Sequence, residues 1–274
     1  DWDSLERLYG ETNDWEGLAE VLGNAAEKAE GAEQKAALSF RAAEVYEAKL
    51  GEPQRAFRSY ERVLAARPDD ERAAKALLPI YQHDEKWSRL PSLYDVLVGH
   101  TTGRAEKLAL LDAAREIASE RLKDGALAMR YATEAFGVDP TSAATREALE
   151  TSAERNGSHA AVVQAFEARL AQVGLAEEGS AERRWLRGRI ASIASEKLAD
   201  VDRAVGALRA VLEESPGDAA ASGELDALLR KAGRHTDLRA HYQQRIELAS
   251  DDAEKWMLIS ELARLEDGEL GDAN

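Results

Sequence analysis

Residues 36–68 read AALSFRAAEVYEAKLGEPQRAFRSYERVLAARP, and this stretch contains the pattern that decides the fold. In its first half, apolar or small side chains recur three or four residues apart, at Leu38, Ala42 and Val45. After the Gly-Glu-Pro break at 51–53, a second set with similar spacing follows, at Ala56, Tyr60 and Val63. Such spacing places side chains on one face of an α-helix, and a short break between two helices makes them antiparallel. The stretch therefore predicts a helical hairpin that ends at Pro68.

The same pattern recurs along the chain with a period of 72 residues. Four leucines share one register, namely Leu38, Leu110, Leu186 and Leu258. A proline and an alanine recur in the same way, at Pro68, Pro140 and Pro216 and at Ala56, Ala128 and Ala204. The interval across residues 173–179 is 76 instead of 72, which indicates a four-residue insertion there. Since one hairpin cannot bury its apolar face alone, the repeats predict hairpins that stack on one another.

The helical pattern fills almost the whole chain. The expected helices are 2–11, 15–30, 33–49, 53–66, 70–83, 87–99, 104–122, 125–138, 142–156, 159–173, 180–198, 201–214, 218–232, 235–249 and 252–266. No segment alternates with period two, so no strand is expected. We expect an all-α solenoid of about fifteen helices that forms a single continuous domain over residues 1–274. Because the chain starts and stops inside a repeat, it is interpreted as a fragment of a longer protein.

Composition excludes several classes of function. The 274 residues carry 52 Asp and Glu against 36 Lys and Arg, and this net charge of −16 disfavours nucleic acid as a partner. There is no cysteine, and therefore no disulfide, thiol nucleophile or cysteine-ligated metal. No run of eighteen apolar residues is present, so membrane insertion is not expected. The compartment, cytoplasmic or periplasmic, is left open.

The hairpin over residues 36–68 resembles the tetratricopeptide repeat family. The residues that carry the resemblance are Ala42, Val45, Ala56, Tyr60, Val63 and Pro68. Two later copies repeat it, at Ala114, Ile117, Ala128, Ala132, Ala135 and Pro140 and at Ile190, Ile193, Ala204, Leu208, Val211 and Pro216. The match departs from the family by two extra residues between the two helices, and the alternate hairpins lack the closing proline. The resemblance implies a right-handed superhelix whose first helices line a concave groove that binds other proteins.

No pattern in the sequence points to catalysis. The nucleotide-binding, zinc-protease and serine-hydrolase motifs are absent. His159 and His235 occupy the register of Trp15 and Trp87, so we expect them to pack at helix starts. Paired carboxylates are numerous, as expected on the solvated faces of an acidic protein. The sequence therefore predicts a protein that is not an enzyme and has no cofactor or metal site.

Three functions remain open. The favoured one is a scaffold that binds a peptide or a partner domain in the concave groove. The alternative is a structural spacer or ring segment of a large assembly, and a remote alternative is a glycan-active enzyme built as an α/α toroid. Acidic residues are scattered over every copy, which speaks against the toroid, whose acids should gather at one mouth of a barrel. The sequence sets no oligomeric state.

The resemblance also places a candidate binding face on the first helix of each hairpin. In the first copy the expected inward residues are Ala36, Ser39, Ala43, Tyr46 and Glu47. The candidate partner-binding residues are Tyr46, Arg115, Arg184, Arg187, Arg230, Lys231 and Trp256. Arginine pairs can hold carboxylates and a tryptophan offers an apolar anchor, so the expected partner is a protein or peptide segment that is acidic and carries an apolar residue.

Three local features are expected to be visible in the structure. The four leucines of the common register should all be buried between stacked helices. Pro79 lies inside a predicted helix and should bend or break it near residues 75–79. The last predicted helix should expose an apolar strip that includes Trp256 and favours self-association.

Overall fold

A computed structural model describes residues 2–175 and 177–270 of the chain, and these contain fifteen α-helices and no strand. The chain divides into two compact units, Asp1–Thr145 and Arg146–Asn274. The first unit contains α1 (Trp2–Glu11), α2 (Trp15–Lys28), α3 (Ala32–Glu44), α4 (Phe57–Ala66), α5 (Glu71–His83), α6 (Leu90–His100), α7 (Arg104–Glu116) and α8 (Gly125–Val138). The second contains most of α9 (Ala143–Asn156), and then α10 (His159–Val173), α11 (Ser180–Glu196), α12 (Val201–Glu214), α13 (Ala219–Lys231), α14 (His235–Leu248) and α15 (Asp252–Leu265).

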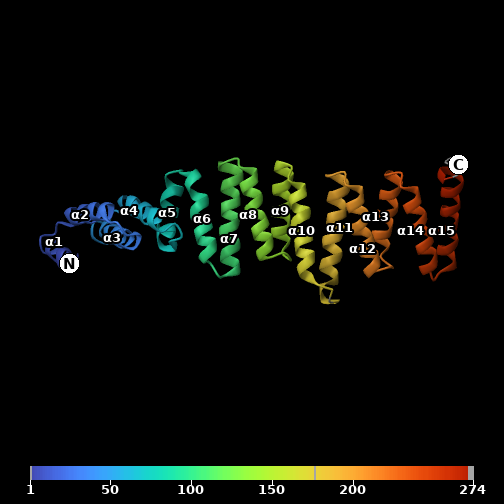
Figure 1. Ribbon diagram of the computed structural model, residues 1–274, viewed down its shortest axis with the longest axis horizontal. Coiled ribbons are helices and arrows are strands. Elements are labelled where there is room, and N and C mark those ends of the chain that lie inside the picture. Colours follow the sequence, from blue (N-terminus) through green and yellow to red (C-terminus); the bar gives the residue numbers. More distant parts are fainter. Residues whose placement is uncertain (1, 176, 271–274) are drawn as a thin grey trace. The chain divides into compact units, whose positions relative to one another are not determined.

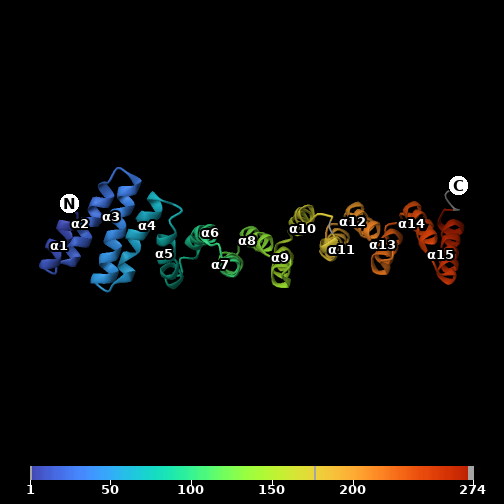
Figure 2. The same ribbon diagram turned by 90° about the horizontal axis from the view of Figure 1, so that it is seen from below.

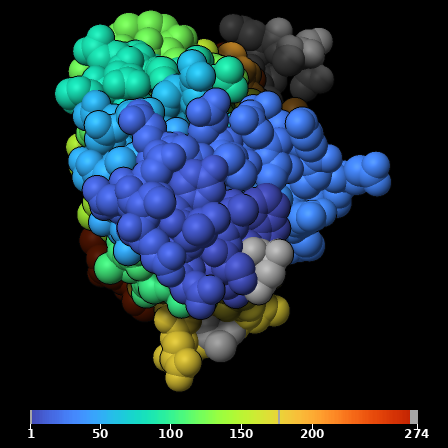
Figure 3. Space-filling view, turned by 90° about the vertical axis from the view of Figure 1, so that its left-hand side faces the viewer, coloured from blue at the N-terminus to red at the C-terminus, as the bar shows by residue number. Residues whose placement is uncertain are grey.

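Within each unit, consecutive helices lie side by side as antiparallel hairpins (Figure 1, Figure 2). At its N-terminal end, the first unit presents its earliest helices to the viewer (Figure 3). The all-helical fold and the number of helices confirm the sequence-based prediction. The single continuous domain expected over 1–274 stays a prediction, and each unit is described here by itself.

The turn after the first helix of each repeat, which is α3, α7 or α11, has the same backbone structure in three copies. The residue at the turn has a positive φ in each, at Gly51 (+69°), Lys123 (+54°) and Ala199 (+53°). In each copy the next amide donates 2.8 Å to the carbonyl six residues earlier, from Glu52 to Tyr46, from Asp124 to Ala118 and from Asp200 to Ala194. A left-handed residue that closes a helix with such a bond is a common C-cap. The turns therefore follow the intervals of 72 and 76 that were read from the sequence.

The turn between the third and fourth helices of each repeat also recurs. It joins α1 to α2, α5 to α6, α9 to α10 and α13 to α14. Its positive-φ residues are Asn13, Glu85, Gly157 and Gly233. In each copy the following amide donates to the carbonyl five residues earlier, and the acceptors are Tyr9, Tyr81, Ala153 and Leu229. Several helices of the chain start at an aspartate whose carboxylate caps the first turn. Asp124 caps α8 and Asp200 caps α12 in this way. Local turn chemistry thus sets where the hairpins begin and end.

Lys123 and Ala199 occupy a backbone conformation that favours glycine. Replacing either by glycine should raise the free energy of unfolding by about 1 kcal/mol, because the left-handed conformation strains a residue with a Cβ atom. The reverse change, Gly51→Ala, should lower it by a similar amount. A Cβ at Gly51 would meet no described atom within 4 Å, so this loss is one of backbone conformation alone. Urea denaturation measures all three variants, and an unchanged or lowered stability of Lys123→Gly would contradict the prediction.

Three of the four register leucines are buried as predicted. Leu38, Leu186 and Leu258 are 3%, 0% and 2% exposed. The prediction is wrong for Leu110, which is half-buried at the edge of the first unit's core. Its neighbour Leu111 is fully buried instead. Two adjacent leucines compete for this place in α7, whereas Ser39, Arg187 and the exposed Ile259 stand at the position of Leu111 in the other copies.

Pro79 does not break its helix. α5 continues from Glu71 to His83 with Pro79 inside it, so the expected local break is wrong. Pro79 is exposed to solvent, which explains why the helix tolerates it. The carbonyl that loses its intrahelical donor at an exposed position can accept a hydrogen bond from water.

The helices end differently from the prediction in detail. The expected helices 33–49 and 104–122 each finish in one π-helical turn, over Val45–Lys49 and Ile117–Arg121. The expected helix 252–266 is likewise followed by a π-helical turn, Glu266–Leu270. Three helices begin with a 3₁₀ turn, at Pro53–Ala56, Trp87–Arg89 and Glu177–Gly179. These wider and tighter turns adjust the entry to each connection without changing the order of helices.

Candidate functional site

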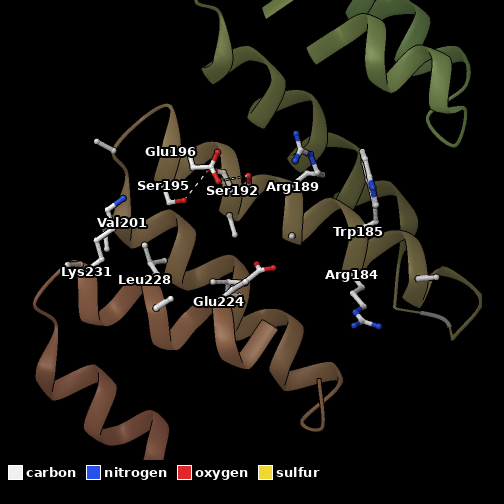
Figure 4. A pocket seen from close by; sticks show the side chains of 17 residues that line it. Arg184, Trp185, Arg189, Ser192, Ser195, Glu196, Val201, Glu224, Leu228 and Lys231 are labelled. Atoms are coloured by element: carbon white, nitrogen blue, oxygen red, sulfur yellow. Dashed lines mark hydrogen bonds between the residues drawn. The ribbon is translucent and has the colours of Figure 1, made fainter. Parts of the chain in front are cut away.

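A groove in the second unit lies between α11 and α13 and encloses about 1100 Å³ (Figure 4). α11 and α13 are the first helices of two consecutive hairpins, and α12 lies between them in sequence. The walls and floor of the groove are formed by Ala181, Arg184, Trp185, Gly188, Arg189, Ala191, Ser192, Ser195, Glu196, Ala199, Val201, Leu208, Glu224, Ala227, Leu228, Lys231 and Ala232.

Small side chains keep the middle of the groove open. α11 faces it with Gly188, Ala191 and Ser195, which recur three and four residues apart on one face of the helix. A Cβ at Gly188 would meet no atom of the described chain within 4 Å. Leu208 of α12, which is 3% exposed, closes the floor. The groove therefore has an apolar floor with room for a side chain that the protein does not supply.

The arginines at the groove are held by carboxylates of the protein itself. Arg184 forms an ion pair of 2.5 Å with Asp218, the N-cap residue of α13. Arg189 makes a two-point contact with Glu150 of α9, at 3.0 and 2.6 Å. In Figure 4 the side chain of Arg189 points away from α13, whereas Arg184 lies at the end of the groove where α13 begins. These ion pairs tie neighbouring hairpins together and partly neutralise the guanidinium charges.

Trp185 is fixed by its neighbours at the edge of the groove. Its ring packs edge-on against Phe166, with ring centroids 5.4 Å apart. The guanidinium carbon of Arg146 lies 3.8 Å from the centroid of the same ring. A tryptophan held on two sides in this way is a rigid wall rather than a mobile anchor.

The structure separates the candidate residues predicted from the sequence. Arg184 and Lys231 both line the groove. Arg187 does not, because it contacts Glu214 (2.5 Å) and the carbonyl of Ala210 (3.0 Å). Arg230 binds Asp226, the hydroxyl of Tyr242 and Glu261.

The other candidates lie elsewhere. Trp256 is 70% exposed on α15 and does not line the groove. In the first unit, Tyr46 is half-buried under the guanidinium of Arg55, and Arg115 pairs with Asp112 of its own helix. The candidates thus form no single cluster in the part of the chain that the structure describes.

The binding face expected in the first copy needs correction. Ala36, Ser39 and Ala43 are fully buried, and the two alanines belong to the core of the first unit together with Ala73 and Leu77. In α3 these positions are therefore covered by the neighbouring helix. In α11 their equivalents Arg184 and Ala191 border the groove instead. Periodicity identifies two faces of a helix, but the neighbouring helix decides which one is covered.

Sequence reasoning missed the residues that shape the groove most. Gly188 and Glu224, which line the groove, were not candidates. A glycine in the middle of a helical pattern is an available signal, since it weakens the helix unless its small size is needed. The same signal also occurs at Gly206 and Gly223, so it does not single out Gly188.

No metal or membrane site is evident in the described ranges. Across residues 2–175 and 177–270, no three His, Asp or Glu side chains are grouped to hold a metal ion. In the same ranges no helix has both the length and the apolar character to cross a membrane. His159 and His235 are half-buried at the first turns of α10 and α14, as predicted.

The comparison with family models agrees with the repeat pattern. The family model described as tetratricopeptide repeat matches residues 37–74. A search of curated proteins finds no match to this chain. One similar solved structure is a tetratricopeptide repeat protein from Parabacteroides merdae, with 13% identity, a TM-score of 0.32 and coverage of 94% of this chain and 96% of that one. Another is the P58(IPK) TPR domain, with 13% identity, a TM-score of 0.31 and coverage of 97% and 77%.

The matched segment contains most of α3, all of α4 and the start of α5. The turns that flank these helices recur in later copies with the same hydrogen bonds. The match and this recurrence support a TPR-like repeat family, and a TPR fold suggests a scaffold for protein interactions.

Proposed function

We propose that this protein is a non-catalytic scaffold that binds a short segment of a partner protein in the groove between α11 and α13. The observation that carries the proposal is the open floor at Gly188, where a Cβ atom would meet no described atom within 4 Å. A groove of about 1100 Å³ with an apolar floor is much larger than one side chain and suits a segment of several residues. The bound segment supplies an apolar side chain above Gly188 and Leu208.

The charged rim gives the segment its orientation. Arg184 lies near the start of α13, and Lys231 lies at its end, so the two cations mark opposite ends of the groove (Figure 4). Lys231 is exposed and has no ion pair to a described residue. The sequence alone predicts an acidic, apolar segment, whose carboxylates would lie at these two cations.

Filling the groove from within tests this function. In Gly188→Leu, the leucine side chain extends into the groove, and we expect loss of at least about tenfold in affinity, since one apolar contact of this size accounts for 1–3 kcal/mol. Leucine also favours a helix over glycine by about 1 kcal/mol, so the variant should fold. The probe is a phage-displayed library of random 12-residue peptides selected on the wild-type protein, followed by fluorescence anisotropy with the enriched peptides.

Gly206→Leu is the matched control. Gly206 is a helical glycine of α12 outside the groove, and a Cβ there would also meet no described atom within 4 Å. It should bind the selected peptides as the wild type does. Equal binding by Gly188→Leu, or failure of the library to enrich any peptide, would refute the groove function and favour the spacer role in which the edges of the helices make the contacts.

A further inference from the structure

The ion pairs of the second unit change the sign of the charge that the groove offers. Arg184, Arg187 and Arg230 each contact a carboxylate of the protein, Asp218, Glu214 and Asp226 respectively. Arg189 is engaged with Glu150 in the same way. A guanidinium that already faces a carboxylate attracts a second one weakly, because the first partner cancels much of its field. Four of the five cations at or near the groove are therefore poor receptors for an acidic segment.

Two carboxylates face the groove instead. Glu224 projects from α13 toward the middle of the groove, and Glu196 projects from the end of α11 on the opposite wall (Figure 4). Both are exposed and neither forms an ion pair with a residue in the described ranges, but Glu196 also lies beside Arg189 and Lys197. Glu196 accepts one hydrogen bond, 3.3 Å long, from the hydroxyl of Ser192.

The C-terminal ends of the two helices lie together at one end of the groove. The first turn of α11 meets the N-cap of α13 through the Arg184–Asp218 pair, so the two helices run in the same direction. Their C-terminal ends, at Glu196 and Lys231, therefore lie at the same end of the groove. The C-terminus of a helix carries a partial negative charge, which favours cations nearby.

Among the described residues that line the groove, Lys231 is the cation without an ion pair, and it lies at the end of the groove near Glu196 rather than in the middle near Glu224 (Figure 4). Lys231 lies seven residues beyond Glu224 on α13, a rise of about 10 Å along the helix axis. This axial separation is slightly more than the screening length of about 8 Å in physiological salt, which weakens the repulsion between Lys231 and a cation at Glu224. The net charge of −16 on the whole chain adds a long-range attraction for basic partners.

We infer that the α11–α13 groove takes a segment with an arginine or lysine side chain, which pairs with Glu224 and Glu196 while an adjacent apolar side chain rests above Gly188. This inference rests on the proposed groove function and specifies its ligand. It reverses the acidic segment expected from the sequence, because that expectation treated the arginines as free.

Peptides that differ only in their charged residues distinguish a basic ligand of the groove from an acidic one. The probes are three fluorescein-labelled 12-residue peptides that share one Leu-Phe centre and are flanked by arginines, glutamines or glutamates. The arginine peptide should bind most tightly at low salt, and its affinity should fall most steeply as salt is added. Glu224→Gln should weaken it about three- to fivefold, as expected for an exposed ion pair, and Glu224→Lys should weaken it further.

Glu213→Gln is the matched control for net charge. Glu213 is an exposed carboxylate of α12 outside the groove, so this variant makes the same change in total charge without touching the site. It should leave binding of the arginine peptide within about twofold of the wild type. Equal losses in Glu213→Gln and Glu224→Gln would show that only the overall field acts and would overturn the assignment to Glu224.

The failure of this inference differs from the failure of the groove function. If the glutamate peptide binds best and Gly188→Leu abolishes that binding, the groove function stands and the inferred basic ligand is wrong. If the arginine peptide binds equally to the wild type and to Gly188→Leu, the proposed groove function is wrong, and so is the basic ligand inferred for it. Preference for the arginine peptide, lost in both Gly188→Leu and Glu224→Lys, is the expected result.

Discussion

Replacing Leu186 with alanine should lower the free energy of unfolding by about 2–5 kcal/mol. Leu186 is completely buried in α11 and is among the largest side chains in the molecule with no solvent exposure. Its removal leaves a cavity between stacked hairpins that the rigid helices cannot close. Chemical denaturation measures the loss.

Leu110→Ala is the matched control, since Leu110 stands in the same register but is half-buried. Its loss should be clearly smaller, because less apolar surface returns to water. In a stack of hairpins each repeat contacts its neighbours only, so hydrogen exchange in Leu186→Ala should accelerate in α10 to α13 and much less in the first unit. Equal losses in the two variants, or acceleration spread evenly from α1 to α15, would contradict this account.

Replacing Glu214 with alanine should lower the free energy of unfolding by about 3 kcal/mol. Arg183 is only 5% exposed, and its Nε donates to both carboxylate oxygens of Glu214, at 3.1 and 3.0 Å. Another nitrogen of Arg183 donates to the carbonyl of Gly174, 2.8 Å away, in the inserted segment before α11. Without Glu214, a buried guanidinium loses its counter-ion, which is expensive in a region shielded from water.

Two comparisons separate this effect from a general loss of charge. Glu150→Ala removes the ion pair between Glu150 and Arg189, which is more exposed than Arg183. This variant should lower the free energy of unfolding by less than about 1 kcal/mol. The double variant Arg183→Met with Glu214→Met replaces both charges by apolar side chains of similar length and should recover much of the stability. Thermal and urea denaturation of the three variants provide the comparison, and an equal loss in all three would show that the burial of Arg183 does not set the cost.

Acid should remove the stabilisation that the Glu214 carboxylate provides. Burial would by itself raise the pKa of Glu214, but hydrogen bonds and charge from Arg187 and Arg183 outweigh it and hold the pKa below its ordinary value of 4.5. The folded state therefore binds this proton less readily than the unfolded state, and the stabilisation is complete above about pH 4.5. It is lost as the pH falls through the lowered pKa. The stability of Glu214→Ala should approach that of the wild type over that range.

The sequence by itself determined the helices, their hairpin order and the register of the repeat. These features depend on interactions within a few residues, such as the left-handed C-cap at Gly51 and the N-cap at Asp200, and such interactions repeat wherever the sequence repeats. The insertion at 173–179 could be read for the same reason, because it shifts every later position by four residues without altering the turns. The hairpin over residues 36–68 also carried enough of the family pattern to be recognised.

Only the tertiary structure decided which charges and faces are available to a partner. Arg183 and Arg184 are adjacent in the sequence and chemically alike, yet one is buried against Glu214 and the other lies at the end of the groove. Their partners are 31 and 34 residues away, in the following helices, and nothing in the local pattern distinguishes them. Helical periodicity gives the direction of a side chain relative to its own helix. Which helix lies opposite, and whether it brings a carboxylate or an apolar surface, depends on how the hairpins stack.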